Sequence, residues 1–184
     1  MLGLYRKFVG TGVILTAFSL AIASLSVSPL YAKTINVPAD YPTIQQAVAV
    51  AVPGDVIQIK GGAPYEECIT ICKSNIKLVG LQKGKKKKRP TIIAYDCGGP
   101  AITICAGVTG VQINGLNIRL SKNEGVLCEG GNDGTVISDC YVVSNFDVGL
   151  RLKGNSMKVQ SCKIFGNRLG GIEVEGNNNT ISQS

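Results

Sequence analysis

The sequence predicts an all-β protein, a single-stranded parallel β-helix with an amphipathic helix covering its N-terminal end. A motif of one small, one apolar, one variable and one apolar residue recurs at residues 101–104, 125–128, 149–152 and 171–174, in steps of 24, 24 and 22 residues. A second apolar motif runs in phase with it at residues 113–118, 137–142 and 159–164, and asparagine recurs at positions 123, 145 and 167. A fixed period of this length indicates repeats that stack on one another.

Residues 1–32 have the features of a secretory signal peptide. A basic start (Arg6, Lys7) precedes an apolar, uncharged run at residues 8–23, and a small-residue cleavage site follows near Ala32. We therefore expect a secreted or periplasmic protein that is cleaved near this site. The alternative is an uncleaved anchor, because the apolar character continues beyond the central run.

The mature domain, residues 33–184, divides into an N-terminal cap (33–60), irregular first turns (61–100) and regular repeats (101–184). Short segments rich in β-branched residues, separated by Gly, Pro, Asn or Lys, predict strands before the regular repeats. These predicted strands are residues 34–37, 56–59, 69–71, 76–80 and 91–93.

The cap contains the only good helix signal in the sequence. Thr43 and Gln46 have the spacing of a capping box, and Pro53 with Gly54 ends the pattern. The helix would close the first layer of the stack with an apolar face. That face consists of Ile44, Ala47, Val48 and Ala51.

Each period holds about three short strands, so one repeat can make a complete turn and return the chain above its start. Periodic asparagines fit a turn with left-handed backbone torsions, and their side chains can bond along the stack. The last copy breaks off at Ser184, which predicts either a fragment of a longer β-helix or an uncapped C-terminal end open to self-association or a partner chain. The inward columns are predicted to be Ile102, Val126, Leu150 and Ile172; Ile104, Cys128, Leu152 and Val174; Ile113, Ile137, Val159 and Ile181; and Leu116, Cys140 and Cys162.

Six segments carry a resemblance to a known family: INVPADYPTIQQAV (35–48), GDVIQI (54–59), YEE (65–67), ITI (69–71), IKLVG (76–80) and GGIEVEGNNNTIS (170–182). They are similar to the opening and the repeats of right-handed parallel β-helix proteins with the pectin-lyase-like fold. The last segment is close to the carbohydrate-binding and sugar-hydrolase-like subgroup, which includes a periplasmic protein that helps mature the copper site of nitrous oxide reductase. The resemblance implies a right-handed coil, but the same scaffold serves lyases, esterases, glycosidases, adhesins and non-catalytic proteins.

The catalytic candidates lie on one predicted outward strip, where chemistry on a β-helix takes place. Arg151 would reach Glu173 on the next turn, and Lys153 would reach Glu129 and Glu175. In a polysaccharide-degrading enzyme of the pectate-lyase or glycosidase type, the acids would protonate a glycosidic oxygen and a base would abstract a proton. The interpretation we favour is a solvated face of ion pairs, each worth under about 1 kcal/mol.

The resemblance supplies no catalytic motif that can be transferred residue by residue. Pectate lyases of this fold hold Ca²⁺ with clustered acids beside an Arg, and pectin esterases use two Asp with a Gln and an Arg on facing strands. Asp133, Asp139 and Asp147 fall in different parts of the repeat, so they cannot supply the 6 to 8 oxygens that Ca²⁺ takes. We therefore expect no cofactor, with Ca²⁺ as the one left open.

The strongest charge feature is a basic run in a sequence whose net charge is +7, made of Lys83, Lys85, Lys86, Lys87, Lys88 and Arg89. Outside the cell such a run can bind uronate or cell-wall polymers, whereas the lack of interleaved aromatics disfavours nucleic acid. The simplest alternative is a solvated loop. We predict an exported, non-catalytic scaffold that binds an anionic polysaccharide or cell-wall polymer; the alternatives are the enzyme above and a periplasmic assembly factor.

The seven cysteines are an odd number, so full pairing would leave one free. Cys68 and Cys72 should both face outward about 13 Å apart, which is too far for one shared metal ion. Cys140 and Cys162 stack on neighbouring turns, where a bridge is conceivable but buried free thiols are favoured. With no His in the chain, we expect no metal site.

Overall fold

The computed structural model describes residues 31–82 and 88–184. The predicted signal peptide lies, up to residue 30, outside the described residues. Within the described ranges, no helix is long and apolar enough to cross a membrane.

The cap and the first turns contain one helix followed by short strands. The predicted strands agree with the observed ones within one residue at each end, and β3 is an additional strand that the sequence did not predict. The elements are β1 (Thr34–Val37), α1 (Ile44–Val50), β2 (Val56–Lys60), β3 (Tyr65–Glu66), β4 (Ile69–Ile71), β5 (Lys77–Leu81) and β6 (Thr91–Ile93).

The regular repeats contain strands of three to six residues. They are β7 (Ile102–Ile104), β8 (Gln112–Asn114), β9 (Asn117–Arg119), β10 (Val126–Cys128), β11 (Val136–Ser138), β12 (Tyr141–Val143), β13 (Val148–Lys153), β14 (Lys158–Gln160), β15 (Lys163–Phe165), β16 (Gly170–Glu175) and β17 (Thr180–Ser182).

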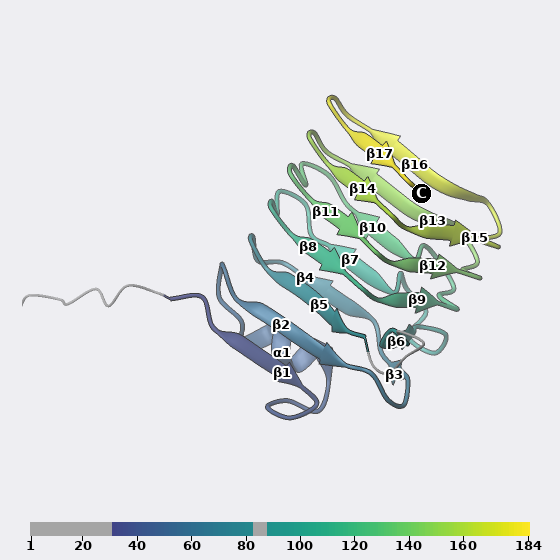
Figure 1. The fold of residues 1–184 in the computed structure, drawn as a ribbon. Helices are drawn as coiled ribbons and strands as arrows, with labels where there is room; N and C mark the ends of the chain where they lie inside the picture. Colours follow the sequence, from purple (N-terminus) through teal and green to yellow (C-terminus); the bar gives the residue numbers. More distant parts are fainter. Residues whose placement is uncertain (1–30, 83–87) are drawn as a thin grey trace, which may run out of the picture. The chain divides into compact units, whose positions relative to one another are not determined.

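All strands pair in parallel and form three sheets, which makes the molecule a parallel β-helix as predicted (Figure 1). Sheet A has the order β1-β2-β5-β8-β11-β14-β17, sheet B has the order β3-β6-β9-β12-β15, and sheet C has the order β4-β7-β10-β13-β16. Each turn passes from sheet A to sheet B and then to sheet C, so matched residues of successive turns lie side by side.

The predicted inward columns are confirmed by the strand register. Val126 pairs with Ile102 on one side and with Leu150 on the other, and all three are fully buried. Side chains alternate between the two faces of a strand. In a three-residue strand, either the middle residue points inward and the outer two point outward, or the outer two point inward and the middle one points outward. Burying an Ile or Leu stabilises the fold by about 1.5–3 kcal/mol, so these columns are the main source of stability.

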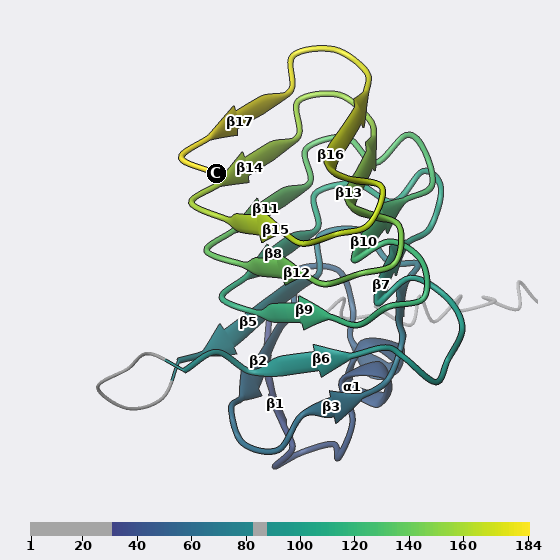
Figure 2. The same cartoon turned by 90° about the vertical axis from the view of Figure 1, so that its right-hand side faces the viewer.

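Helix α1 closes the N-terminal end of the stack, as Figure 2 shows from the side. Its predicted apolar face is buried, and Thr43 Oγ1 accepts a hydrogen bond from the backbone N–H three residues later. Two charged residues that flank β4 hold the helix ends. The Glu67 carboxylate accepts from the N–H of Ile44 (2.9 Å), and Lys73 Nζ donates to Ala49 O (2.6 Å). The cap is therefore tied to the first strand of sheet C.

The predicted left-handed torsions at the periodic asparagines are wrong. The residues with positive φ precede the ladder positions and are Leu120 (57°), Ser144 (56°) and Gly166 (65°). Asn123 is also out of register, because the backbone N–H that bonds to Asn145 Oδ1 (3.0 Å) is that of Ser121. The strained torsion therefore falls on the residue before each ladder position, and these positions are Ser121, Asn145 and Asn167.

The predicted bonding of asparagine along the stack is confirmed one turn further on. Asn145 donates from both its backbone N–H (3.1 Å) and its Nδ2 (2.9 Å) to Asn167 Oδ1, and Asn167 Nδ2 donates to Val142 O (3.0 Å). Asn145 is buried, so these bonds satisfy polar groups that have no access to water.

This asparagine ladder explains the small residue that opens each repeat motif. A Cβ atom on Gly149 would lie 2.6 Å from Asn167 Nδ2 and 2.7 Å from Gly171 O. A Cβ atom on Gly125 would meet Asn145 Nδ2 at 2.8 Å in the same way. The motif position is therefore small because the ladder of the next turn fills the space.

Strands β15, β16 and β17 form the C-terminal edges of the three sheets. Ile181 continues an inward column whose earlier members are buried, yet it is 49% exposed. The register runs to the end of the chain, since Cys162 N–H donates to Ser184 Oγ (3.4 Å). The predicted column positions thus extend into the last turn.

Candidate functional site

The predicted charged strip on sheet C is present in part. Arg151 Nη1 lies 2.9 Å from Glu173 Oε2, and Lys153 Nζ lies 3.3 Å from Glu175 Oε1. The expected pair between Lys153 and Glu129 does not form among the described residues. Glu129 instead accepts a hydrogen bond from the backbone N–H of Ala106 (3.2 Å), which lies in the turn below.

Two further carboxylates complete the surroundings of Arg151. Glu124 Oε1 lies 2.8 Å from Nε, and Asp147 Oδ1 lies 3.3 Å from Nη2. Glu124 and Asp147 precede the strands that carry the strip. A comparison of matched positions within the predicted strands therefore does not find them. Desolvation lowers the pKa of Arg151, but its hydrogen bond to Glu124 and the charges of Glu173, Glu124 and Asp147 raise it overall.

This arrangement is an ion-pair network centred on one guanidinium. Its three carboxylates all face the same cation, and the Glu124 side chain is only 11% exposed. A general acid and base need separate environments that push their pKa values apart. The geometry therefore favours the structural interpretation of the strip.

Replacing Arg151 by glutamine is expected to lower the free energy of unfolding at neutral pH by about 1–2 kcal/mol, because three carboxylates lose their shared cation. Urea denaturation of the variant and of the unchanged protein at neutral pH measures the difference.

Lys153→Gln is the matched control, since it removes one exposed pair worth under about 1 kcal/mol. A variant of Arg151 that is as stable as the unchanged protein would contradict the network.

The predicted basic run is described only at its end. Lys83, Lys85, Lys86 and Lys87 lie outside the described residues, and Lys88 is exposed. Arg89 takes part in the fold instead of standing free. Its guanidinium contacts the Asp139 carboxylate, its Nε donates to Asp139 O (2.8 Å), and its Cζ lies 4.1 Å from the centre of the Tyr141 ring.

The outward side of sheet B, which starts beside this run, combines cations with aromatic rings. We call this surface the basic aromatic face. Within the described residues its four cations make no ion pair, whereas both cations of the sheet C strip are paired. The face consists of Arg119, Lys122, Lys163 and Arg168 together with Tyr95, Tyr141, Phe146 and Phe165.

Three aromatic side chains leave much of this face exposed. Phe146 and Phe165 are 45% and 61% exposed, and Tyr95 is 48% exposed. Arg119 Nε, by contrast, is buried and has no hydrogen-bond partner in the described part of the chain.

Lys122, Phe146 and Arg168 form a column at the corner between sheets B and C. The backbone ladder continues through the corner, because Phe146 N–H donates to Ser121 O (2.9 Å) and Arg168 N–H donates to the carbonyl one turn below it (3.0 Å). Tyr95 packs against this column. Its ring centre lies 6.3 Å from that of Phe146 and 4.8 Å from Lys122 Nζ.

A groove of about 270 Å³ opens at the upper part of this corner. We call it the corner groove. It is lined by Leu120, Ser144, Asn145, Phe146, Gly166 and Arg168. The apolar repeat positions contain no signal for it, because these residues lie in the bends between strands.

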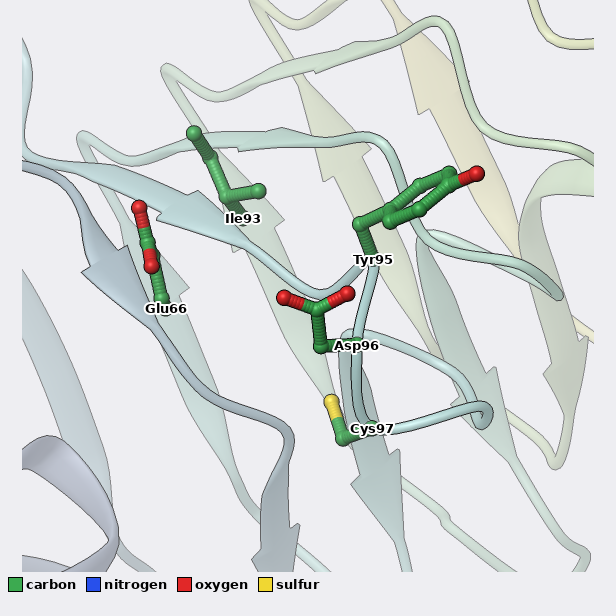
Figure 3. A pocket seen from close by; sticks show the side chains of 5 residues that line it. All are labelled: Glu66, Ile93, Tyr95, Asp96 and Cys97. Carbon is green, nitrogen blue, oxygen red and sulfur yellow. The ribbon is translucent and has the colours of Figure 1, made fainter.

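A smaller pocket of about 110 Å³ lies at the N-terminal end of sheet B (Figure 3). Glu66 on β3 and Asp96 in the loop after β6 lie on its two sides, and Tyr95 points away from Glu66. The two carboxylates make this end of the sheet acidic. An anionic ligand on the basic aromatic face would therefore be repelled below Tyr95.

Two disulfides that the sequence analysis did not predict join the turn of β4 to the turn of β7. Cys68 is bonded to Cys97 and Cys72 to Cys105, with Cα atoms 6.0 and 4.9 Å apart. The sequence contains a signal for the second bridge, since Ile-Thr-Ile-Cys occurs at 69–72 and again at 102–105. The step between the copies is 33 residues, so a search at 22–24 residues passes over it.

Cys128, Cys140 and Cys162 are free and buried, so the favoured interpretation of Cys140 and Cys162 is confirmed. Burial raises the pKa of Cys128 to about 12. The hydrogen bond to Cys162 and burial raise the pKa of Cys140 well above its ordinary value. Cys128 and Cys140 are therefore neutral and pack as small apolar side chains. The hydrogen bond from Cys140 instead lowers the pKa of Cys162 to about 7. Among the residues with described positions, no three His, Cys, Asp or Glu gather to hold a metal ion.

The structure is similar to that of a pectin methylesterase. A crystal structure of that enzyme in complex with a hexasaccharide superposes with a TM-score of 0.50 at 17% sequence identity. The match covers 83% of this chain and 66% of the enzyme, so the chain spans less than two thirds of the length of that protein. No protein-family model matches the sequence, and a search of the curated proteins found no match.

The catalytic pattern that the resemblance implied for pectin esterases can be tested on this fold. Two Asp with a Gln and an Arg on facing strands would have to stand on an outward face. No strand in residues 31–82 and 88–184 contains an Asp, and the strand carboxylates there are Glu66, Glu173 and Glu175. Glu173 and Glu175 are both engaged in ion pairs.

Proposed function

We propose that this chain is an exported, non-catalytic β-helix scaffold that binds an anionic polysaccharide on its basic aromatic face. The observation that carries the proposal is the set of four cations without ion pairs in the described structure, placed among exposed aromatic rings on successive turns. Cations bind the carboxylates or sulfates of the polymer, and flat apolar rings pack against sugar faces. The resemblance to the carbohydrate-binding subgroup and the hexasaccharide of the pectin methylesterase structure are consistent with a glycan ligand.

Export rests on the N-terminal segment of the sequence, with its basic start and apolar run. The basic run from Lys83 to Lys88 adds positive charge that attracts a polyanion over a long range. The engagement of the sheet C carboxylates by Arg151 and Lys153 supports binding over catalysis. A polysaccharide-degrading enzyme is the alternative, and the incubation with polygalacturonate described below tests it.

The purified chain is expected to be retained on immobilised polygalacturonate at low salt and to elute as salt is raised. Replacing Arg119 and Lys163 by glutamine should weaken the affinity about tenfold, because two free cations of the face are lost. Replacing Lys77 and Lys158 together by glutamine is the matched control, since it removes two lysines on the outward side of sheet A. Equal losses in both variants would show that only net charge matters and would contradict a specific face.

Incubation of the same protein with polygalacturonate and Ca²⁺ distinguishes the enzyme. Unsaturated product in the absorbance assay would overturn the non-catalytic proposal. Retention without product supports it, and retention that disappears when Lys85 to Lys88 become glutamine would assign part of the binding to the basic run.

A further inference from the structure

We infer that the corner groove is a subsite for one anionic pyranose residue of the polymer, with the sugar ring stacked on Phe146 and its anionic group bound by Arg168. This inference rests on the proposed function, since it names the place and the chemistry of one contact on the basic aromatic face. A groove of about 270 Å³ is large enough for a single sugar ring.

The backbone of two successive bends shapes the groove. Ser144 and Gly166 have positive φ angles of 56° and 65°, and each is followed two residues later by an outward side chain, Phe146 or Arg168. The buried asparagine ladder between them fixes both bends. Asn145 lines the groove, but its amide is already used within the ladder, so the ring and the guanidinium provide the recognition.

Tyr95 holds the Phe146 ring from one side, and the exposed part of the ring stays free to stack against a ligand. Tyr95 packs against it at 59° between the ring planes, and Phe146 still keeps 45% of its surface exposed. Such a ring loses little conformational freedom when a ligand binds. Arg168 is exposed and free of ion pairs within the described residues, and its planar guanidinium can bind a carboxylate or a sulfate through two hydrogen bonds.

The corner column also indicates the direction in which the polymer would run relative to the axis of the stack. Lys122, Phe146 and Arg168 come from consecutive turns, which are spaced by about 4.8 Å along the stack. This spacing is close to the length of one pyranose residue in a chain. A polymer lying along the helix axis therefore places the sugar next to the groove over Lys122 and Tyr95, and the acidic pocket at Glu66 and Asp96 marks the lower limit.

The test uses the full chain and a short oligogalacturonate, with the affinity measured by calorimetry. Phe146→Ala is expected to weaken binding about tenfold, and Arg168→Gln by a similar factor. With the methyl-esterified oligosaccharide, which lacks the charge, Phe146→Ala should still weaken binding, whereas Arg168→Gln should have no further effect. Val50→Ala and Lys158→Gln are the controls, since they remove an exposed apolar side chain and an exposed charge elsewhere.

Circular dichroism of each variant confirms that the fold is retained, and Phe146→Tyr should restore the affinity if the ring face is what matters. A sulfated oligosaccharide in place of the uronate separates the two sources of the anion. Tighter binding of single-stranded oligonucleotide than of any saccharide would overturn the assignment to a sugar.

The two proposals fail in different ways. If the unchanged protein does not bind polygalacturonate at all, the proposed function is wrong. If it binds the polymer and Phe146→Ala keeps the oligosaccharide affinity within about twofold, the face stands and the groove is not the subsite.

Discussion

Replacing Cys68 and Cys97 by serine is expected to lower the free energy of unfolding by about 3–4 kcal/mol, as the length of the loop that this bridge closes predicts. The bonded residues are separated by 29 positions, and those of the second bridge by 33. A crosslink across such a loop restricts the unfolded chain while leaving the native contacts in place. Urea denaturation of the variant and of the oxidised protein measures the difference.

The position of the bridges strengthens this expectation. Cys68 and Cys72 stand at the two ends of β4, and the turn that follows β4 is longer than the later turns and contains the basic run. Without the two disulfides, only the hydrogen bonds between parallel strands would hold this longer turn in the stack. The effect of the substitution should vanish when both proteins are compared under reducing conditions.

A thiol count provides an independent check. In denaturant without reductant, the unchanged chain should expose three titratable thiols, those of Cys128, Cys140 and Cys162. A count of seven, or a variant that is as stable as the oxidised protein, would contradict the disulfide assignment. The serine variant itself should also expose three.

Gly149→Ala is expected to cost about 2–3 kcal/mol, because an added methyl group has no space. It would lie 2.6 Å from Asn167 Nδ2, 2.7 Å from Gly171 O and 2.9 Å from a methyl group of Ile164. Neither the backbone carbonyl of Gly171 nor the hydrogen-bonded amide of Asn167 can move without breaking the ladder. Thermal or urea unfolding measures the loss.

Gly62→Ala is the matched control, because a Cβ atom at this glycine meets nothing within 4 Å. That variant should be neutral, or more stable by up to about 1 kcal/mol through the stiffer unfolded chain. Similar stability of the two variants would show that the space beside the ladder is not restrictive.

The inward half of the fold could be predicted from the sequence, because alternation within a three-residue strand leaves one choice of buried side. Ile102, Val126 and Leu150 needed only the repeat period to be placed in one column. The turns could not be predicted in the same way. The asparagine period included Asn123, whereas the ladder position on that turn belongs to Ser121.

The candidate sites show the same limit. Arg151 and Glu173 stand on strands and were paired correctly, but Glu124 and Asp147 reach the guanidinium from the bends before their strands. The corner column has a signal in the sequence, since Lys122 and Phe146 are 24 residues apart and Phe146 and Arg168 are 22 apart. Its members differ in chemistry, so a comparison that seeks like residues at each step does not find it.

Charged side chains are distributed differently on sheets B and C. Sheet B and its corner carry cations without ion pairs in the described structure, while sheet C carries acids that outnumber their cations, as around Arg151. A polyanion bound along the basic aromatic face, as we propose, would be repelled by these acids if it spread past the corner. The acids of sheet C would therefore confine it to sheet B and its corner.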